Sequence, residues 1–180
     1  MLKVENLDKT LSNKNNTFRL HNISFTLPKG YICGLVGENG SGKSSLIKCI
    51  AGLYQPDNGN IFIQDMPFYK GEAKNKDMLG IVLDTSFYNQ NFDLIQIGRF
   101  YGSLYGAFDF KQYLRYLSLF HIDSKKKFKH LSKGMKTKVQ ISFALSHNAK
   151  LFLFDEPENG LDKNSREELL KICTELVSDG

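Results

Sequence analysis

The feature that most constrains the fold is a glycine-rich segment at residues 37–45, which matches the phosphate-binding loop pattern G-x-x-x-x-G-K-[ST]. Glycines let the backbone turn tightly around a polyphosphate, so that several N–H groups point inward. Lys43 would supply positive charge to the β- and γ-phosphates, and the Ser44 hydroxyl is placed to bind Mg²⁺. The motif predicts a nucleotide-binding protein.

The segments on either side of the loop fit this interpretation. The apolar run at residues 31–36 predicts a short buried strand that leads into the loop. Residues 46–51 predict a helix that ends at Gly52 and directs its positive N-terminus at the anion. The residues expected to hold the nucleotide are Gly37, Asn39, Gly40, Ser41, Gly42, Lys43, Ser44 and Ser45.

Composition narrows the class of protein further. At 180 residues the chain fits one domain with a substantial core, and its 3 cysteines are odd in number and widely spaced. We therefore expect buried, reduced thiols in a cytoplasmic protein. No apolar run approaches the roughly 20 residues needed to span a bilayer, and the first residues lack the apolar segment expected of a signal peptide. The basic run at residues 125–130 predicts a solvated loop, with a nucleic-acid patch as the less favoured alternative.

The order of predicted strands indicates an α/β protein. The first 30 residues alternate as antiparallel strands around a polar loop at residues 13–16. A turn at residues 56–59 precedes a strand at 61–63, and residues 79–83 form another predicted buried strand. We expect a phosphate-loop core joined to an antiparallel β subdomain.

An aromatic stretch at residues 87–120 holds half of the chain's 14 Phe and 8 Tyr residues. Its apolar spacing becomes helical through Leu114 and Phe120, which predicts a small helical subdomain at about residues 86–148. The aromatic density has two interpretations. Exposed rings such as Tyr88 and Phe92 would form a docking surface, whereas buried rings would form the core of the subdomain.

Two adjacent carboxylates follow the apolar segment at residues 151–154, which predicts a buried strand. Asp155 would hold Mg²⁺, and Glu156 would orient and deprotonate an attacking water. Farther on, Ser165 and Glu168 predict a capping box at the start of a last helix.

These motifs together resemble the ATP-binding subunits of ABC transporters along nearly the whole chain. Residues 37–44 resemble the Walker A motif, and residues 153–157 resemble Walker B with its catalytic glutamate, Glu156. Residues 159–162 are similar to the D-loop, and residues 131–135 occupy the place of the LSGGQ signature. The Ser-Lys-Gly-Met variant is similar to that of a branch of small bacterial exporter ATPases.

The resemblance implies an ABC ATPase fold and an ATPase that powers a membrane transporter. Each ATP, with Mg²⁺, would lie between the Walker motifs of one subunit and Ser132 and Gly134 of another. Implied partners are a transmembrane permease and a second ATP-binding subunit, without nucleic acid, at the inner face of the cell membrane. The alternative is a soluble ATPase of the same superfamily that acts on DNA or ribosomes. The absence of sustained heptads between Lys43 and Ser132 disfavours the DNA-repair branch.

The sequence departs from the family pattern at several positions. Asp84 stands where the family has a glutamine that reaches Mg²⁺, so Asp84 is a candidate metal ligand and Gln90 the second choice. Lys133 and Met135 replace a glycine and a glutamine, and an added lysine near phosphate is electrostatically favourable. The adenine-stacking position falls near Leu11, which has no aromatic face.

Another aromatic residue could take the adenine-stacking role, and the end of the chain also differs from the family pattern. Phe18 is the alternative platform for adenine. The family's switch histidine would lie past Gly180, whereas His147 precedes the Walker B segment and is expected to be exposed. We therefore expect a single domain, residues 1–180, that lacks the family's final strands. We expect its nucleotide-binding loop to be intact and its ATPase activity to be reduced by the missing strands.

Overall fold

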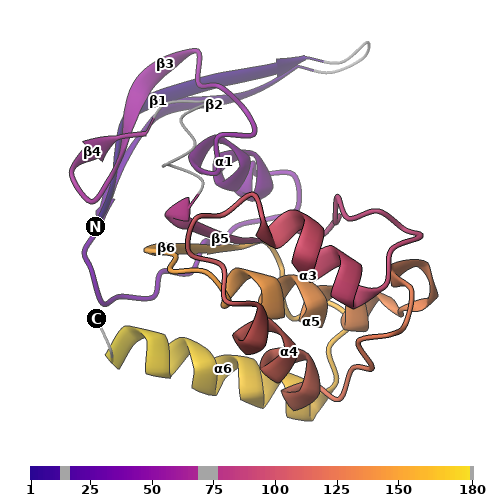
Figure 1. The fold of residues 1–180 in the computed structure, drawn as a ribbon. Helices are drawn as coiled ribbons and strands as arrows, with labels where there is room; N and C mark the ends of the chain where they lie inside the picture. The colour runs from indigo at the N-terminus through magenta and orange to yellow at the C-terminus, as the bar shows by residue number, and fades with distance from the viewer. Residues whose placement is uncertain (13–16, 69–76, 179–180) are drawn as a thin grey trace. The chain divides into compact units, whose positions relative to one another are not determined.

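The computed structural model describes residues 1–12, 17–68 and 77–178. These fall into two compact units (Figure 1). Unit 1 comprises the described residues within 1–75 and 172–180, and unit 2 those within 76–171. No helix in the described ranges is long and apolar enough to cross a membrane.

Unit 1 contains an antiparallel sheet with strand order β2-β1-β3-β4 (Figure 1). Its strands are β1 (Leu2–Ser12), β2 (Thr17–Leu27), β3 (Asn58–Ile63) and β4 (Met66–Pro67). Val4 of β1 pairs with Phe25 on one side and with Ile61 on the other. The predicted antiparallel layer and the strand at 61–63 are confirmed, while the predicted loop at 13–16 lies outside the described residues.

A bulge in β1 explains why its apolar residues do not follow a period of two. Leu2, Val4 and Leu7 are all buried, although strict alternation would turn Leu7 outward. The register shifts between Val4 and Leu7, and Asn6 between them has a φ of 47°. The extra residue returns Leu7 to the core face, and asparagine tolerates this left-handed conformation better than most residues.

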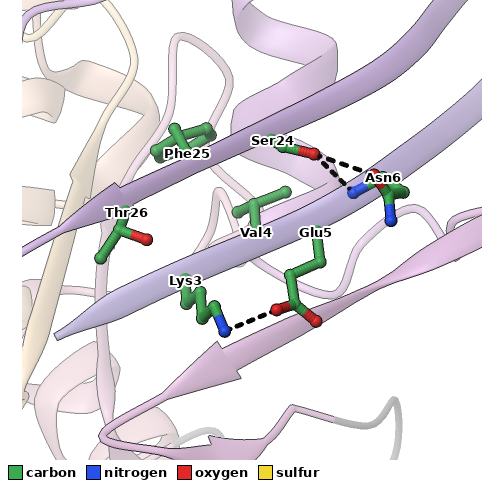
Figure 2. A pocket seen from close by; sticks show the side chains of 7 residues that line it. All are labelled: Lys3, Val4, Glu5, Asn6, Ser24, Phe25 and Thr26. Carbon is green, nitrogen blue, oxygen red and sulfur yellow. Dashed lines mark hydrogen bonds and ion pairs between the residues drawn. The ribbon is translucent and has the colours of Figure 1, made fainter.

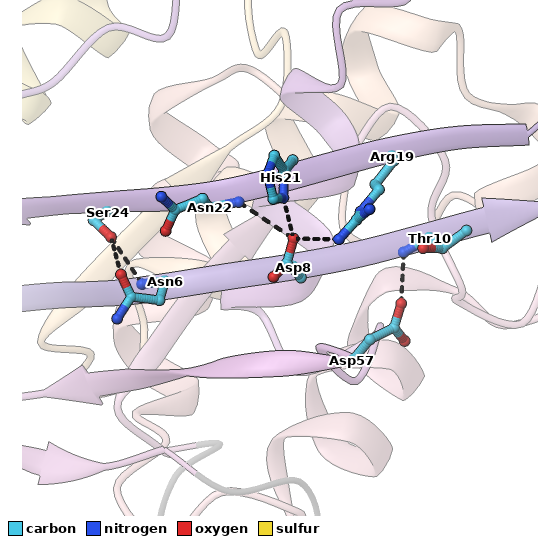
Figure 3. Close-up of polar contacts among 8 residues, drawn as sticks. All are labelled: Asn6, Asp8, Thr10, Arg19, His21, Asn22, Ser24 and Asp57. Carbon is cyan, nitrogen blue, oxygen red and sulfur yellow. Dashed lines mark hydrogen bonds and ion pairs between the residues drawn. The ribbon is translucent and has the colours of Figure 1, made fainter.

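Side chains join β1 to β2, and β1 to the residue just before β3, beyond the backbone ladder (Figure 3). Asp8 Oδ1 lies 2.7 Å from His21 Nδ1 and accepts a hydrogen bond of 3.2 Å from Arg19. The contact with His21 is the main reason why the pKa of Asp8 lies below its usual value. On the other side of β1, Asp57 accepts a hydrogen bond of 2.6 Å from the Thr10 amide.

Unit 1 also contains helix α1 (Lys43–Ile50), as predicted, and Gly52 follows it with a φ of 71°. The predicted strand at residues 31–36 is wrong. None of these residues joins either sheet, and their side chains are exposed, Val36 by 97 %. Without a neighbouring strand their backbone groups have no ladder to complete, so the segment stays irregular. Cys33 is therefore exposed rather than buried as predicted, whereas Cys49 is buried.

Unit 2 is built on two parallel strands, β5 (Leu79–Val82) and β6 (Leu151–Phe154), which confirm the two predicted core strands. The helical elements are α3 (Leu94–Gly102), α4 (Phe110–Leu119), the 3₁₀ helix η1 (Phe128–His130), α5 (Lys133–Ala144) and α6 (Lys163–Ser178), which begins in this unit (Figure 1). The basic run at 125–130 is exposed except for Phe128, which anchors it.

Two local predictions in unit 2 are wrong. His147 is only 6 % exposed, because its ring packs 4.4 Å from that of Tyr105 and its Nε2 lies 2.8 Å from the Leu79 carbonyl oxygen. Helix α6 begins at Lys163, two residues before the predicted cap, Ser165. The carboxylate of Asp162 accepts from the Ser165 amide at 3.0 Å and thus caps the helix.

Candidate functional site

The phosphate-binding loop in unit 1 is closed by its own lysine. Lys43, the first residue of α1, donates hydrogen bonds to the carbonyl oxygens of Gly37 at 2.7 Å and Glu38 at 2.9 Å. The Ser41 amide also donates to Glu38, at 3.2 Å. These contacts fix an ammonium group across the loop at the positive end of a helix, an arrangement suited to a polyphosphate.

The sheet of unit 1 supports this loop at Gly42, the N-cap of α1. Gly42 has a φ of 99°, which favours glycine. A Cβ atom there would lie 2.5 Å from Phe18 Cζ and 2.8 Å from Leu20 Cδ2. The ring of Phe18 thus packs against the phosphate end of the site, while Leu11 pairs with Phe18 across β1 and β2. An adenine-stacking role for Phe18 stays a prediction.

The two carboxylates after β6 lie in unit 2 and differ in environment. Asp155 is 7 % exposed, and its amide donates to the Val82 carbonyl at 2.9 Å, at the end of the β5–β6 pairing. Glu156 is exposed with a φ of 50°, and its carboxylate accepts a hydrogen bond from the Asn159 side-chain amide. A buried carboxylate suits a cation, and an exposed one suits proton transfer to and from water.

Helix α5 presents the predicted signature residues at its N-terminus. Ser132 is the N-cap, and its Oγ accepts from the Met135 amide at 3.3 Å. Gly134 is buried directly against the Gly160 carbonyl, in the loop after β6. The structure therefore places the signature residues in contact with the predicted D-loop.

The structure places Asp84 beside Lys133 at the start of α5. Lys133 Nζ lies 2.5 Å from Asp84 Oδ1. Gln90, the second candidate metal ligand, donates instead to the Tyr88 carbonyl at 3.4 Å. In the described part of the chain, no group of three or more His, Cys, Asp or Glu residues could hold a metal. The metal role of Asp84 stays a prediction. Sequence reasoning missed the ion pair, although opposite charges at two unusual positions were a signal for it.

The aromatic stretch divides into a core and an exposed part. Tyr88 packs edge-on against Tyr101 and Phe128, with ring centroids 5.0 and 5.5 Å away, and burial raises the pKa of its phenol well above the usual value. Tyr88 is half-buried within this ring cluster, which favours the core interpretation over the docking surface for this side chain. The exposed large apolar side chains of this stretch are Phe87, Phe100, Leu104 and Leu119.

A shallow pocket on the sheet of unit 1 has little capacity for chemistry. Residues 3–6 of β1 and 24–26 of β2 line it (Figure 2). Its two charged side chains, Lys3 and Glu5, form an ion pair of 2.5 Å with each other, and Ser24 is hydrogen-bonded to Asn6 (Figure 2). This pocket does not include the phosphate-binding loop.

The phosphate-binding loop before α1 and the carboxylates after a parallel strand are features of P-loop nucleotide-binding proteins. The profile of the ABC transporter family matches residues 20–159. The chain therefore belongs to the ABC transporter family.

Individual relatives agree with this assignment. The linearmycin resistance ATP-binding protein LnrL of Bacillus subtilis is 35 % identical over 100 % of this chain and 58 % of its own length. A solved ATP-binding subunit of an ABC transporter is 29 % identical with a TM-score of 0.86, over 99 % of this chain and 75 % of that one. A bacterial ABC transporter cassette solved as a dimer shares the fold, with a TM-score of 0.87 and 23 % identity over 99 % and 84 % of the two chains. The chain spans little more than half of LnrL.

Gly134→Ala tests the contact between the signature helix and the D-loop. The added methyl group would collide with the Gly160 backbone, so we expect a loss of about 2 kcal/mol and a Tm lower by roughly 5 °C. Gly34→Ala is the control, because a Cβ atom at Gly34 meets nothing within 4 Å. Equal melting temperatures for both variants in a calorimetric scan would contradict the contact.

Proposed function

We propose that this chain is the ATP-binding and ATP-hydrolysing subunit of a membrane ABC transporter and that it works as an ATP-sandwiched dimer. The observation that carries the proposal is the loop at residues 37–45, with Lys43 fixed across it, in a member of the ABC transporter family. The phosphates of ATP accept hydrogen bonds from the loop amides. They also replace the carbonyl oxygens as the partners of the Lys43 ammonium group.

The chain's own residues provide ligands for the Mg²⁺ that accompanies ATP. The Ser44 hydroxyl and the buried Asp155 carboxylate are the oxygen ligands that this cation prefers. When bound, Mg²⁺ neutralises charge on the β- and γ-phosphates. Glu156 accepts a proton from the attacking water, while the Asn159 amide holds the carboxylate in one orientation.

The partners in this proposal are a second ATP-binding subunit and a permease. Ser132 and Gly134, at the positive N-terminus of α5, bind the γ-phosphate of the ATP held by the second subunit. The dimeric cassette that shares this fold supports such an assembly. The chain is then a peripheral protein on the cytoplasmic face of the membrane, and the match to the ABC transporter family favours transport over action on DNA or ribosomes.

Lys43→Ala tests ATP binding. The variant removes the ammonium group at the loop, so we expect affinity for a fluorescent ATP analogue with Mg²⁺ to fall at least tenfold, as about 1.4 kcal/mol of lost charge interaction implies. Lys48→Ala is a matched control on the same helix, since its ammonium faces the Tyr54 ring at 5.6 Å. If Lys43→Ala and wild type bind the analogue equally well, the assignment of the loop is wrong.

Glu156→Gln separates hydrolysis from binding. The amide oxygen of glutamine still accepts the hydrogen bond from Asn159, but the side chain no longer accepts a proton. We expect phosphate release to slow at least ~10-fold, the low end for a general base. ATP affinity should remain, and light scattering should detect a tighter ATP-dependent dimer. Hydrolysis at the wild-type rate by a monomer would exclude both the base and the sandwich.

Exposed Phe87, Phe100 and Leu104 are the candidate contacts with the permease. Phe100→Ser should leave Tm within about 2 °C, because an exposed ring contributes little to stability, but should weaken co-purification with the partner permease. Tyr88→Ala, which removes a core ring, should lower Tm by several degrees, about 3 kcal/mol of packing. Undiminished co-purification of the Phe100 variant would place the permease contact elsewhere.

A further inference from the structure

The first turn of α5 contains a charge that its own helix disfavours. Lys133 is the first residue of the helix, where the helix dipole is positive, and the first turn has no acidic residue. Asp84, which lies just after β5, supplies the missing negative charge at 2.5 Å. The side chains of Lys133 and Asp84 are 57 % and 51 % exposed, so the ion pair contributes little to the stability of the fold. Its effect is to hold the start of α5 next to the residue after β5.

A second link joins the same two elements inside the core. Gln140 of α5 donates to the Leu83 carbonyl at 3.0 Å and accepts from the Leu83 amide at 3.2 Å. Gln140 is buried, and Leu83 lies one residue beyond the last β5–β6 pair, Val82 with Phe154. One side chain thus supplies both hydrogen bonds that a neighbouring strand would supply.

We propose that Gln140 and the Asp84–Lys133 ion pair are positioning residues that tie the N-terminus of α5 to the end of β5 and so fix Ser132 and Gly134. The inference deepens the proposed function, on which its catalytic consequence rests. Asp84 then acts through Lys133 rather than as a ligand of Mg²⁺. Asp84 and Lys133, which both depart from the family pattern, act as a pair. The positive charge of Lys133 at the start of α5 is balanced by Asp84, because the first turn of α5 contains no acidic residue.

Charge exchange tests the ion pair without nucleotide. The readout is hydrogen exchange of the Met135 and Lys136 amides, which are bonded to the Oγ and the carbonyl of Ser132. Asp84→Lys and Lys133→Asp place like charges together, so each should accelerate exchange about fivefold, the lower end of coupling between linked sites. The double variant should return to within about twofold of wild type. Unchanged exchange in the single variants, or no recovery in the double variant, overturns the proposal.

Two controls separate this link from general effects. Lys3→Glu combined with Glu5→Lys exchanges another exposed ion pair of 2.5 Å and should leave the α5 amides unchanged. Gln140→Met keeps an unbranched side chain but removes both hydrogen bonds, so the Leu83 and Met135 amides should both exchange faster. Gln112→Met is the matched control, since the Gln112 side-chain amide donates to the Tyr116 hydroxyl, at 3.4 Å, within one helix. Unchanged Met135 exchange in Gln140→Met would remove Gln140 from the link.

The same variants measured with ATP connect the link to function. The ATP concentration for half-maximal dimerisation by light scattering should rise about fivefold in the single charge variants and recover in the double variant. If Asp84 were a Mg²⁺ ligand or Lys133 a phosphate ligand, the double variant would stay impaired, and the proposal would fail. A wild-type chain that neither binds ATP nor dimerises would refute the proposed function, while the exchange measurement without nucleotide would still decide the link.

Discussion

The buried amide and carbonyl of Leu83 must find hydrogen-bond partners, and the position of helix α5 depends on how they do so. The parallel pairing of β5 with β6 ends one residue earlier, and Gln140 completes it from the helix. Lys138, on the same helix, lies 3.1 Å from Asp162 in the loop after β6. Helix α5 is therefore attached to the segments at the carboxyl ends of both strands, where the carboxylates of the proposed site begin.

The antiparallel sheet of unit 1 has a comparable role for the phosphate-binding loop. Gly42 rests on Phe18 and Leu20 of β2, so the turn that delivers Lys43 is supported by side chains of the sheet. Such a contact leaves no space for a larger residue, and the motif's glycine is required by packing as well as by backbone conformation. The sheet thus supports the predicted nucleotide-binding loop through side-chain packing.

Sequence reasoning succeeded where the determinants are local or periodic. Helix α1, the strand before Asp155 and the helical spacing through Leu114 depend on neighbours within a few residues, and all were predicted. It failed where contacts with segments distant in the sequence determine the local structure or the burial of a side chain. The run at residues 31–36 has the composition of a strand but no partner, and His147 is buried because Tyr105 and the Leu79 carbonyl receive its ring. The ion pair of Asp84 with Lys133 likewise depends on tertiary contact.

The backbone at Glu156 has a consequence for how this chain can change. A φ of 50° is costly for a residue with a Cβ atom, by about 1 kcal/mol, whereas glycine or asparagine would adopt it more readily. Neither of these residues can accept a proton from water as a carboxylate does. Backbone stability and the proposed acceptance of a proton are thus opposed at one position. A variant library selected only for heat resistance should replace Glu156, whereas one selected for phosphate release should retain it.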